Sequence, residues 1–168
     1  MAEQFLTFKI GDARYAVSVF RVLEVLPYSK PQPLPCPDPL IAGIIRSRDR
    51  NVAIVRLREK FGLDRKEADN DTHIVVFEIG DNGTKTLFGG IVDSVQEVIS
   101  LDLNEREPPP PMGNTIASRF VSGVGVRNGE YIIILNADTI FTCDELETIC
   151  DAVITKQEEE NETAFQQH

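Results

Sequence analysis

The chain has 168 residues, of which 42% are hydrophobic and 26% charged, values typical of one globular domain or two small subdomains. Its formal net charge of −10 argues against nonspecific binding to nucleic acid. No apolar run approaches the roughly 18 residues of a membrane span. The first residues also lack the basic and apolar regions of a secretory signal. We therefore expect a cytoplasmic protein with no direct membrane insertion.

The first quarter of the chain predicts a β-hairpin, a short helix and a stiff connector. Alternating apolar residues at 6–10, a Gly11-Asp12 turn and an apolar run at 14–17 are typical of two paired strands. Apolar residues at 19, 22, 23, 25 and 26 favour a short helix or an irregular turn of helix, packed on its 19/22/23/26 face. Residues 27–39 contain six of the ten prolines, a density that indicates an extended connector.

A second hairpin is predicted between Gly43 and Arg58. Apolar runs at 44–45 and 52–55 flank a charged tip that contains Arg46, Arg48, Asp49 and Arg50. If the strand is regular, alternation places residues 46, 48 and 50 on one face. A short helix at 57–61, capped by Gly62, follows.

The remaining segments to residue 135 read as short strands and turns. In chain order we expect a charged loop at 64–71, a strand at 74–79, a turn at 81–83 and strands at 85–92 and 95–99. A proline-containing loop at 104–118 and a strand at 120–126, interrupted by Gly123, follow. The last two segments are a type I′ turn at Asn128-Gly129 and a strand at 131–135 that is buried on both faces. Many short strands separated by turns favour an all-β sandwich or barrel.

The C-terminal segment differs in composition. Residues 142–168 contain eight carboxylates and one lysine, a net charge of −7, so the acidity of the chain is mostly a property of this segment. Thr142 and Glu145 match a capping box, and apolar residues at 146, 149, 150 and 153 indicate one face of a helix. Beyond Lys156 we expect disorder. The predicted division is a domain at 1–141 and an acidic helix and tail at 142–168.

Catalytic and metal-binding patterns are hard to find in the sequence. Three cysteines without Cys-x-x-Cys spacing oppose a zinc site, and we expect no metal and no cofactor. Asp93 is expected to cap a turn, His73 to be structural and Cys36 to be half-buried. We expect a protein that is not an enzyme; the alternative is a small enzyme that uses Asp93, His73 or Cys36.

The one concentration of basic charge is the set of arginines at 46, 48, 50, 56 and 58. These side chains could form a docking patch for an acidic partner surface. They could equally be solvated residues paired with Asp49 and Glu59. The residues alone leave both interpretations open.

The order of these segments resembles that of the CheW-like chemotaxis coupling proteins. The opening stretch 5–11 with Tyr15, followed by 22–25, is similar to the start of that family. Residues 43–58 resemble its pattern Gly-Val-Ile-Asn-Leu-Arg-Gly-x-x-x-Pro-Val-x-Asp-Leu-Arg, and further similarity lies at 89–95, 120–123 and 132–136. The resemblance runs without large gaps from about Phe5 to Phe141.

The resemblance implies two SH3-like, five-stranded β-barrel subdomains with short helices and no catalysis. It implies an adaptor that couples the cytoplasmic tip of methyl-accepting chemoreceptors to the regulatory domain of a chemotaxis histidine kinase. Carried over by position, the receptor-binding residues are Arg48, Glu24, Asn51 and His73. The kinase-binding residues are Val22, Gly43 and Ile44.

The chain also departs from the family pattern at the hairpin. Arg46-Ser47 replaces Asn-Leu, Asp49 replaces a glycine, Ala53 replaces a proline and Arg56 replaces an aspartate. Because glycine tolerates positive φ better than aspartate, the change at Asp49 bears on the tight turn. An alternative is therefore an auxiliary CheW-like regulator, for example of a type IV pilus system, with an altered receptor contact. A third interpretation is a free-standing regulator that has lost kinase binding and uses the acidic segment 142–168 as its interaction element.

Overall fold

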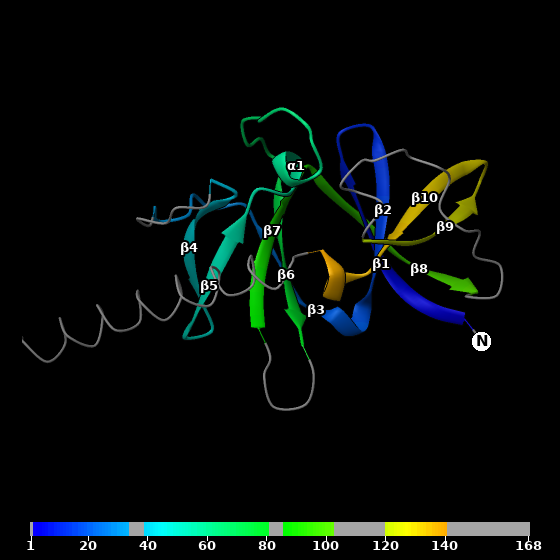
Figure 1. The fold of residues 1–168 in the computed structure, drawn as a ribbon, viewed down its shortest axis with the longest axis horizontal. Helices are drawn as coiled ribbons and strands as arrows, with labels where there is room; N and C mark the ends of the chain where they lie inside the picture. The colour runs from blue at the N-terminus through cyan, green and yellow to red at the C-terminus, as the bar shows by residue number, and fades with distance from the viewer. Residues whose placement is uncertain (1, 34–38, 81–85, 103–119, 141–168) are drawn as a thin grey trace, which may run out of the picture.

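A computed structural model of the chain describes residues 2–33, 39–80, 86–102 and 120–140, and shows two five-stranded β-sheets side by side (Figure 1). The expected turn at 81–83, the four-proline run at 108–111 and the acidic segment 142–168 lie outside the described residues. The predicted domain boundary at residue 141 lies outside them as well.

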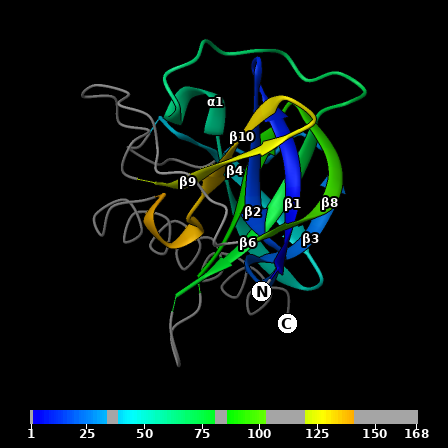
Figure 2. The same cartoon turned by 90° about the vertical axis from the view of Figure 1, so that its right-hand side faces the viewer.

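The first sheet, called here the terminal sheet, is built from both ends of the described chain. Its strands are β1 (Ala2–Ile10), β2 (Ala13–Ser18), β8 (Ser94–Asp102), β9 (Val121–Arg127) and β10 (Glu130–Leu135), in the order β8-β1-β2-β10-β9. The second, called the middle sheet, contains β3 (Val22–Pro27), β4 (Ile41–Ser47), β5 (Arg50–Val55), β6 (His73–Ile79) and β7 (Thr86–Val92), in the order β3-β6-β7-β5-β4. Figure 2 shows the terminal sheet facing the viewer.

The two sheets share one plan. In each, the return strand of one hairpin runs parallel to the second strand of another: β2 beside β10, and β7 beside β5. The five strands of the middle sheet follow one another in the chain between β2 and β8. The predicted all-β class with two SH3-like subdomains is confirmed, and the helices are short: η1 (Val19–Arg21), α1 (Leu57–Lys60) and η4 (Ala137–Thr139).

The helix predicted at 18–26 is wrong. Only η1 is helical there, and the chain continues as strand β3, which pairs antiparallel with β6 from Val22 opposite Phe77 to Pro27 opposite His73. The apolar positions fit either period over so short a stretch. Hydrogen bonding to β6, about fifty residues away in the chain, stabilises the extended form. The β-branched residues Val22 and Val25 also favour a strand.

Two further local predictions are confirmed and one is wrong. Gly62 has φ +85° and, with Leu63, closes α1 through bonds from Gly62 N–H to Glu59 O and from Leu63 N–H to Arg58 O, a Schellman motif. Asn128 and Gly129 have φ of 54° and 79°, as a type I′ turn requires. The strand at 131–135 is not buried on both faces, because Tyr131 is 69% exposed.

Apolar packing joins the sheets into one body. The largest cluster takes buried side chains from both sheets, including Phe8 of β1 and Phe77 of β6. Ring contacts link Phe8, Tyr15, Phe61 and Phe120 in sequence, with adjacent ring centroids 5.1–6.0 Å apart. Burial in this cluster raises the pKa of the Tyr15 hydroxyl above its ordinary value. Each sheet also has a smaller cluster of its own.

One polar residue is fully buried in the terminal sheet for a local reason. The pairing of β1 with β8 shifts register between Leu6 and Phe8, which leaves Thr7 at a bulge. The Thr7 hydroxyl donates to Glu97 O at 2.6 Å and accepts from Glu97 N–H at 3.0 Å. The side chain thus replaces the two backbone bonds that the bulge interrupts.

Replacing Thr7 by Val should destabilise the fold by about 1–3 kcal/mol, because the substitution removes both hydrogen bonds that the buried hydroxyl makes to the backbone N–H and C=O of Glu97. Urea denaturation measures the free energy of unfolding. Thr7→Ser keeps the hydroxyl and should lose clearly less than Thr7→Val. Equal losses for the two variants would contradict the role assigned to the hydroxyl.

Asp93, between β7 and β8, ties the two sheets together. Its carboxylate accepts from the Gly11 N–H at 2.8 Å and from an Arg58 guanidinium N–H at 2.6 Å. Its own N–H donates to Lys9 O at 2.9 Å. The expected turn-capping role is confirmed for the β1–β2 turn, and the carboxylate also forms an ion pair with Arg58.

Asp93→Ala should lower the free energy of unfolding by about 2 kcal/mol, the usual worth of a charge-assisted hydrogen bond at a partly buried site. The same denaturation assay measures the loss. A matched exposed change, Asp12→Ala in the turn itself, should stay within about 0.5 kcal/mol of wild type. The assignment fails if the two substitutions cost the same.

Candidate functional site

The β4–β5 hairpin presents its charged tip on a tight turn without glycine. Arg48 and Asp49 have φ of 49° and 62°, so both central residues are left-handed, as in a type I′ turn. Ser47 lies opposite Arg50, and Arg46 opposite Asn51. The expectation that residues 46, 48 and 50 share a face is therefore wrong, because the chain reverses at 48–49 and Arg46 and Arg50 lie on opposite faces.

Glu24 of β3 holds this tip in place. Its carboxylate accepts a hydrogen bond from the Ser47 hydroxyl and forms an ion pair with Arg48 Nε at 3.1 Å. The Glu24 side chain is 12% exposed and that of Arg48 is 72% exposed. Since β3 and β4 are opposite edges of the middle sheet, these contacts show that the sheet curls until its edges meet. Two residues predicted for receptor binding are thus brought together.

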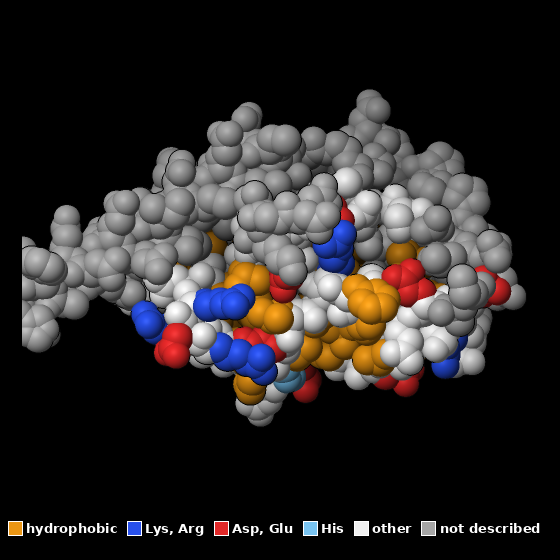
Figure 3. All heavy atoms as spheres, turned by 90° about the horizontal axis from the view of Figure 1, so that it is seen from below, with side chains coloured by type: hydrophobic (Ala, Val, Ile, Leu, Met, Phe, Trp, Pro, Cys, Tyr) orange, Lys and Arg blue, Asp and Glu red, His pale blue; other side chains and the backbone are white. Residues whose placement is uncertain are grey.

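Three exposed apolar side chains lie beside this contact, and the sequence did not predict their exposure. Phe20 of η1 is 83% exposed, and Leu23 and Val25 of β3 are 37% and 38% exposed. We call these three residues the apolar edge. Seen from below, hydrophobic side chains gather on this face with charged side chains at its borders (Figure 3). Large exposed apolar side chains of this kind mark interaction surfaces.

The apolar edge was missed because it depends on β3 being a strand. Alternation in β3 turns Leu23 and Val25 outward while Val22, Glu24 and Leu26 are more covered. A helix would have placed residues 19, 22, 23 and 26 on one buried face instead. The signal available in the sequence was Phe20, which lies outside that helical face.

A groove of about 460 Å³ adjoins Phe20 on the side of the terminal sheet. Apolar side chains of Phe5, Val17 and Ile134 contribute to its lining. Arg21 and Asp138 also line it and form an ion pair at 2.7 Å that links η1 to η4. The apolar edge therefore continues into a hollow that is lined by the terminal sheet, η1 and the segment around η4.

The remaining predicted residues are less accessible. Gly43 and Ile44 are buried, because Gln32 of the connector pairs with Ile44 through two backbone bonds of 2.9 Å. Val22 is half-buried against the core. Asn51 is half-buried beside the tip. His73 is also half-buried, and its Nδ1 lies 2.7 Å from Asp71 O.

Two of the five arginines do not belong to a docking patch. Arg56 donates to Pro39 O at 2.5 Å and to Ile41 O at 3.4 Å, so it holds the end of the connector and the start of β4 against the junction of β5 with α1. Arg58 is engaged by Asp93 and by Asp64 O. The expected pairing of the arginines with Glu59 is wrong for Arg58, and Glu59 lies 3.9 Å from Arg65 instead.

Among the residues that the structure describes, no three His, Cys, Asp or Glu side chains are grouped so as to hold a metal ion. In the same part of the chain, no helix is both long and apolar enough to cross a membrane.

Comparison with known proteins identifies the class. The CheW-like domain model matches residues 4–145, and the chain belongs to the CheW-like family. It is 25% identical over 146 residues to the chemotaxis protein CheW of Klebsiella aerogenes, covering 87% of this chain and 86% of the relative. It is 25% identical over 149 residues to CheW of Treponema pallidum, covering 88% and 87%.

A solved structure is similar as well. The crystal structure of the scaffolding protein TtCheW from Thermoanaerobacter tengcongensis superposes with a TM-score of 0.74 at 30% identity, covering 86% of this chain and 95% of that one. The predicted resemblance to chemotaxis coupling proteins is confirmed at the level of the family.

Gly43→Ala should destabilise the fold by several kcal/mol, on the order of the strain costs for a backbone clash in a packed site. Gly43 has φ +149°, and a Cβ there would lie 2.2 Å from Gln32 O. Thermal or urea denaturation measures the effect. Gly62→Ala is the control. Gly62 also has a positive φ, but a Cβ there would have no atom within 4 Å, so this substitution should lower the free energy of unfolding clearly less. Equal costs would show that the Gln32 contact does not constrain residue 43.

Proposed function

We propose that this protein is a noncatalytic adaptor that couples chemoreceptors to a chemotaxis-type histidine kinase. The observation that carries the proposal is the exposed apolar edge beside the Glu24–Arg48 contact, in a chain of the CheW-like family. An adaptor needs no cofactor and no reacting group, only surfaces held at a fixed angle. The proposal places the protein in the cytoplasm, where receptor tip and kinase are both accessible.

The receptor tip is assigned to the hairpin end of the middle sheet. Arg48 is the exposed charge there, and Glu24 fixes its direction before any partner arrives. Such preorganisation lowers the entropy cost of binding. Asn51 and His73 complete the set proposed to contact receptors, with the smaller accessible areas that their half-buried positions allow.

The kinase regulatory domain is assigned to the surface around β3 and β4. Val22, Gly43 and Ile44 are the residues proposed for this contact. Because Gly43 and Ile44 are buried beneath Gln32, we propose that they act by shaping the β4 edge. The apolar edge supplies the contact area, since well-packed aromatic and aliphatic side chains contribute most of the binding energy at interfaces.

The changes from the family's hairpin pattern bear on the alternative, an auxiliary regulator with an altered receptor contact. Asp49 keeps the tight turn, and Arg56 is engaged by backbone carbonyls away from the tip. The altered groups that remain at the tip are Arg46 and Ser47, and Ser47 is bonded to Glu24. These observations favour a retained receptor contact.

Two substitutions should separate the two partners. Phe20→Ser should weaken binding of the kinase regulatory domain by about 30-fold, the worth of a truncated aromatic anchor of about 2 kcal/mol. Arg48→Ala should weaken binding of a receptor tip fragment by a similar factor, because it removes a desolvated charge from the contact. Titration calorimetry with each fragment gives both constants.

Each variant is the control for the other partner, and unchanged unfolding curves establish that both fold. Kinase binding without receptor binding in the wild-type protein would support the auxiliary regulator instead. Binding of neither fragment would sink the adaptor proposal.

A further inference from the structure

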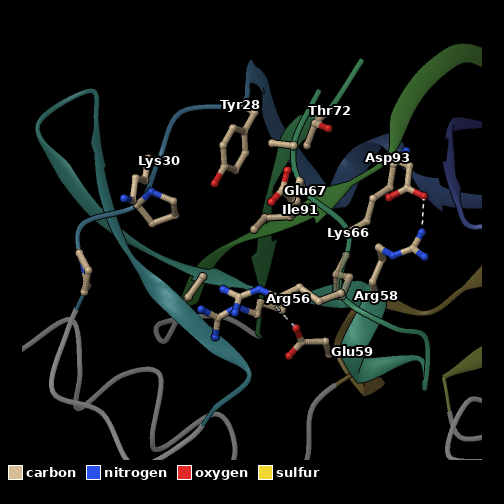
Figure 4. A pocket seen from close by; sticks show the side chains of 16 residues that line it. Tyr28, Lys30, Arg56, Arg58, Glu59, Lys66, Glu67, Thr72, Ile91 and Asp93 are labelled. Atoms are coloured by element: carbon tan, nitrogen blue, oxygen red, sulfur yellow. Dashed lines mark hydrogen bonds and ion pairs between the residues drawn. The ribbon is translucent and has the colours of Figure 1, made fainter. Parts of the chain in front are cut away.

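A second cavity lies at the end of the middle sheet opposite the hairpin tip. It has a volume of about 240 Å³ and is enclosed by the proline-rich connector, the junction of β5 with α1, and the loop that precedes β6 (Figure 4). Apolar side chains of Leu57, Ile91 and Ala42 contribute to its lining, together with Tyr28. None of the residues assigned to receptor or kinase lines it.

The lining is rich in positive charge in a protein whose net charge is −10. It contains five basic side chains, Lys30, Arg56, Arg58, Arg65 and Lys66, and three acidic ones, Glu59, Glu67 and Asp93. Not all of the positive charge is compensated within the described residues. Arg58 is paired with Asp93 at 2.6 Å, Arg65 lies 3.9 Å from Glu59, and Lys66 lies 3.3 Å from the exposed Asp69.

Two cations remain without a carboxylate partner in the part of the chain that the structure describes. Within the described residues, the Arg56 guanidinium donates to the backbone carbonyls of Pro39 and Ile41 and meets no carboxylate. Lys30, on the connector, is exposed, and no acidic side chain of the described residues pairs with it. Both line the same cavity. An anionic group seated there would gain charge-assisted hydrogen bonds next to an apolar wall.

The chain itself contains an acidic segment whose charge is opposite to that of the pocket. Residues 142–168 hold eight carboxylates and one lysine. The described chain ends at Ile140, which is buried in the same apolar cluster as Leu57, a residue that lines the cavity. The acidic positions 144–162 begin four residues later. At about 3.3 Å per extended residue, they reach from roughly 13 Å to roughly 70 Å beyond Ile140.

We propose that the acidic segment 142–168 docks in cis on this basic pocket, with carboxylates paired to Lys30 and Arg56. Each pair is individually weak near solvent. Several carboxylates on one tether raise the local concentration into the millimolar range, which makes repeated pairing effective. The contact is screened by salt.

Zero-length carbodiimide coupling of the full-length protein tests the proposal, because it joins only amines and carboxylates already in contact. We expect Lys30 and Lys66 to couple to acidic residues of 144–162 at low salt, and the yield to fall in 0.5 M NaCl. Coupling of Lys66 to Asp69, 3.3 Å apart, is the internal positive control. Mixing isotope-labelled and unlabelled protein separates coupling within one chain from coupling between two copies.

The variant Lys30→Glu should reduce coupling of Lys66 to the acidic segment by about two- to fivefold, the effect of one surface ion pair. Arg50→Glu, an equal charge change at the far end of the hairpin, should leave it unchanged. The proposal is overturned if Lys66 couples to Asp69 but not to 144–162, if the two variants act alike, or if the coupled pairs join different copies.

Discussion

The arrangement of the two sheets depends on the point where the chain crosses from one to the other at Asp93. Its carboxylate accepts from Gly11 of the terminal sheet's first turn and from Arg58 beside the middle sheet, while its N–H donates to Lys9 O. Three bonds from one residue therefore restrain both sheets at a single crossing. The shared apolar cluster supplies most of the cohesion because burial is non-directional, and the polar contacts select the orientation in which that burial occurs.

That orientation is what an adaptor requires. The groove beside Phe20 takes its lining from β1, β2, η1, β9, β10 and the segment around η4, so it lies on the terminal sheet and the two short helices next to it. The Arg21–Asp138 ion pair joins these two helices, and bonds from Arg21 to Gly80 O and from Gly80 N–H to Asp138 connect them to the end of β6 in the middle sheet. The groove and the β3 part of the apolar edge thus belong to different sheets, whose relative placement these contacts restrain. Rigid coupling, with no reacting group, then suffices to hold two partners in a defined geometry.

The strands and turns could be predicted locally because period-two alternation and residues such as Asn128-Gly129 carry their own signal. The segment 18–26 could not, because its apolar spacing fits both periods and its partner strand begins at His73. The role of Arg58 depends on Asp93, 35 positions away, and that of Glu24 on Ser47 and Arg48. The family resemblance located the candidate residues, but whether each is exposed, buried or engaged depends on contacts that no local pattern contains.

The hairpin tip shows how a departure from the family pattern is absorbed. A type I′ turn without glycine puts Arg48 and Asp49 in the left-handed region, a strain of roughly 1–2 kcal/mol for each residue that aspartate lessens through local hydrogen bonding. The Glu24 carboxylate offsets that strain by bonding to Ser47 and pairing with Arg48. Because Glu24 lies on the opposite edge strand, the same contact closes the middle sheet. The backbone at the tip is therefore set by the closure of the sheet, and sequence change there alters the groups offered to a partner more than their position.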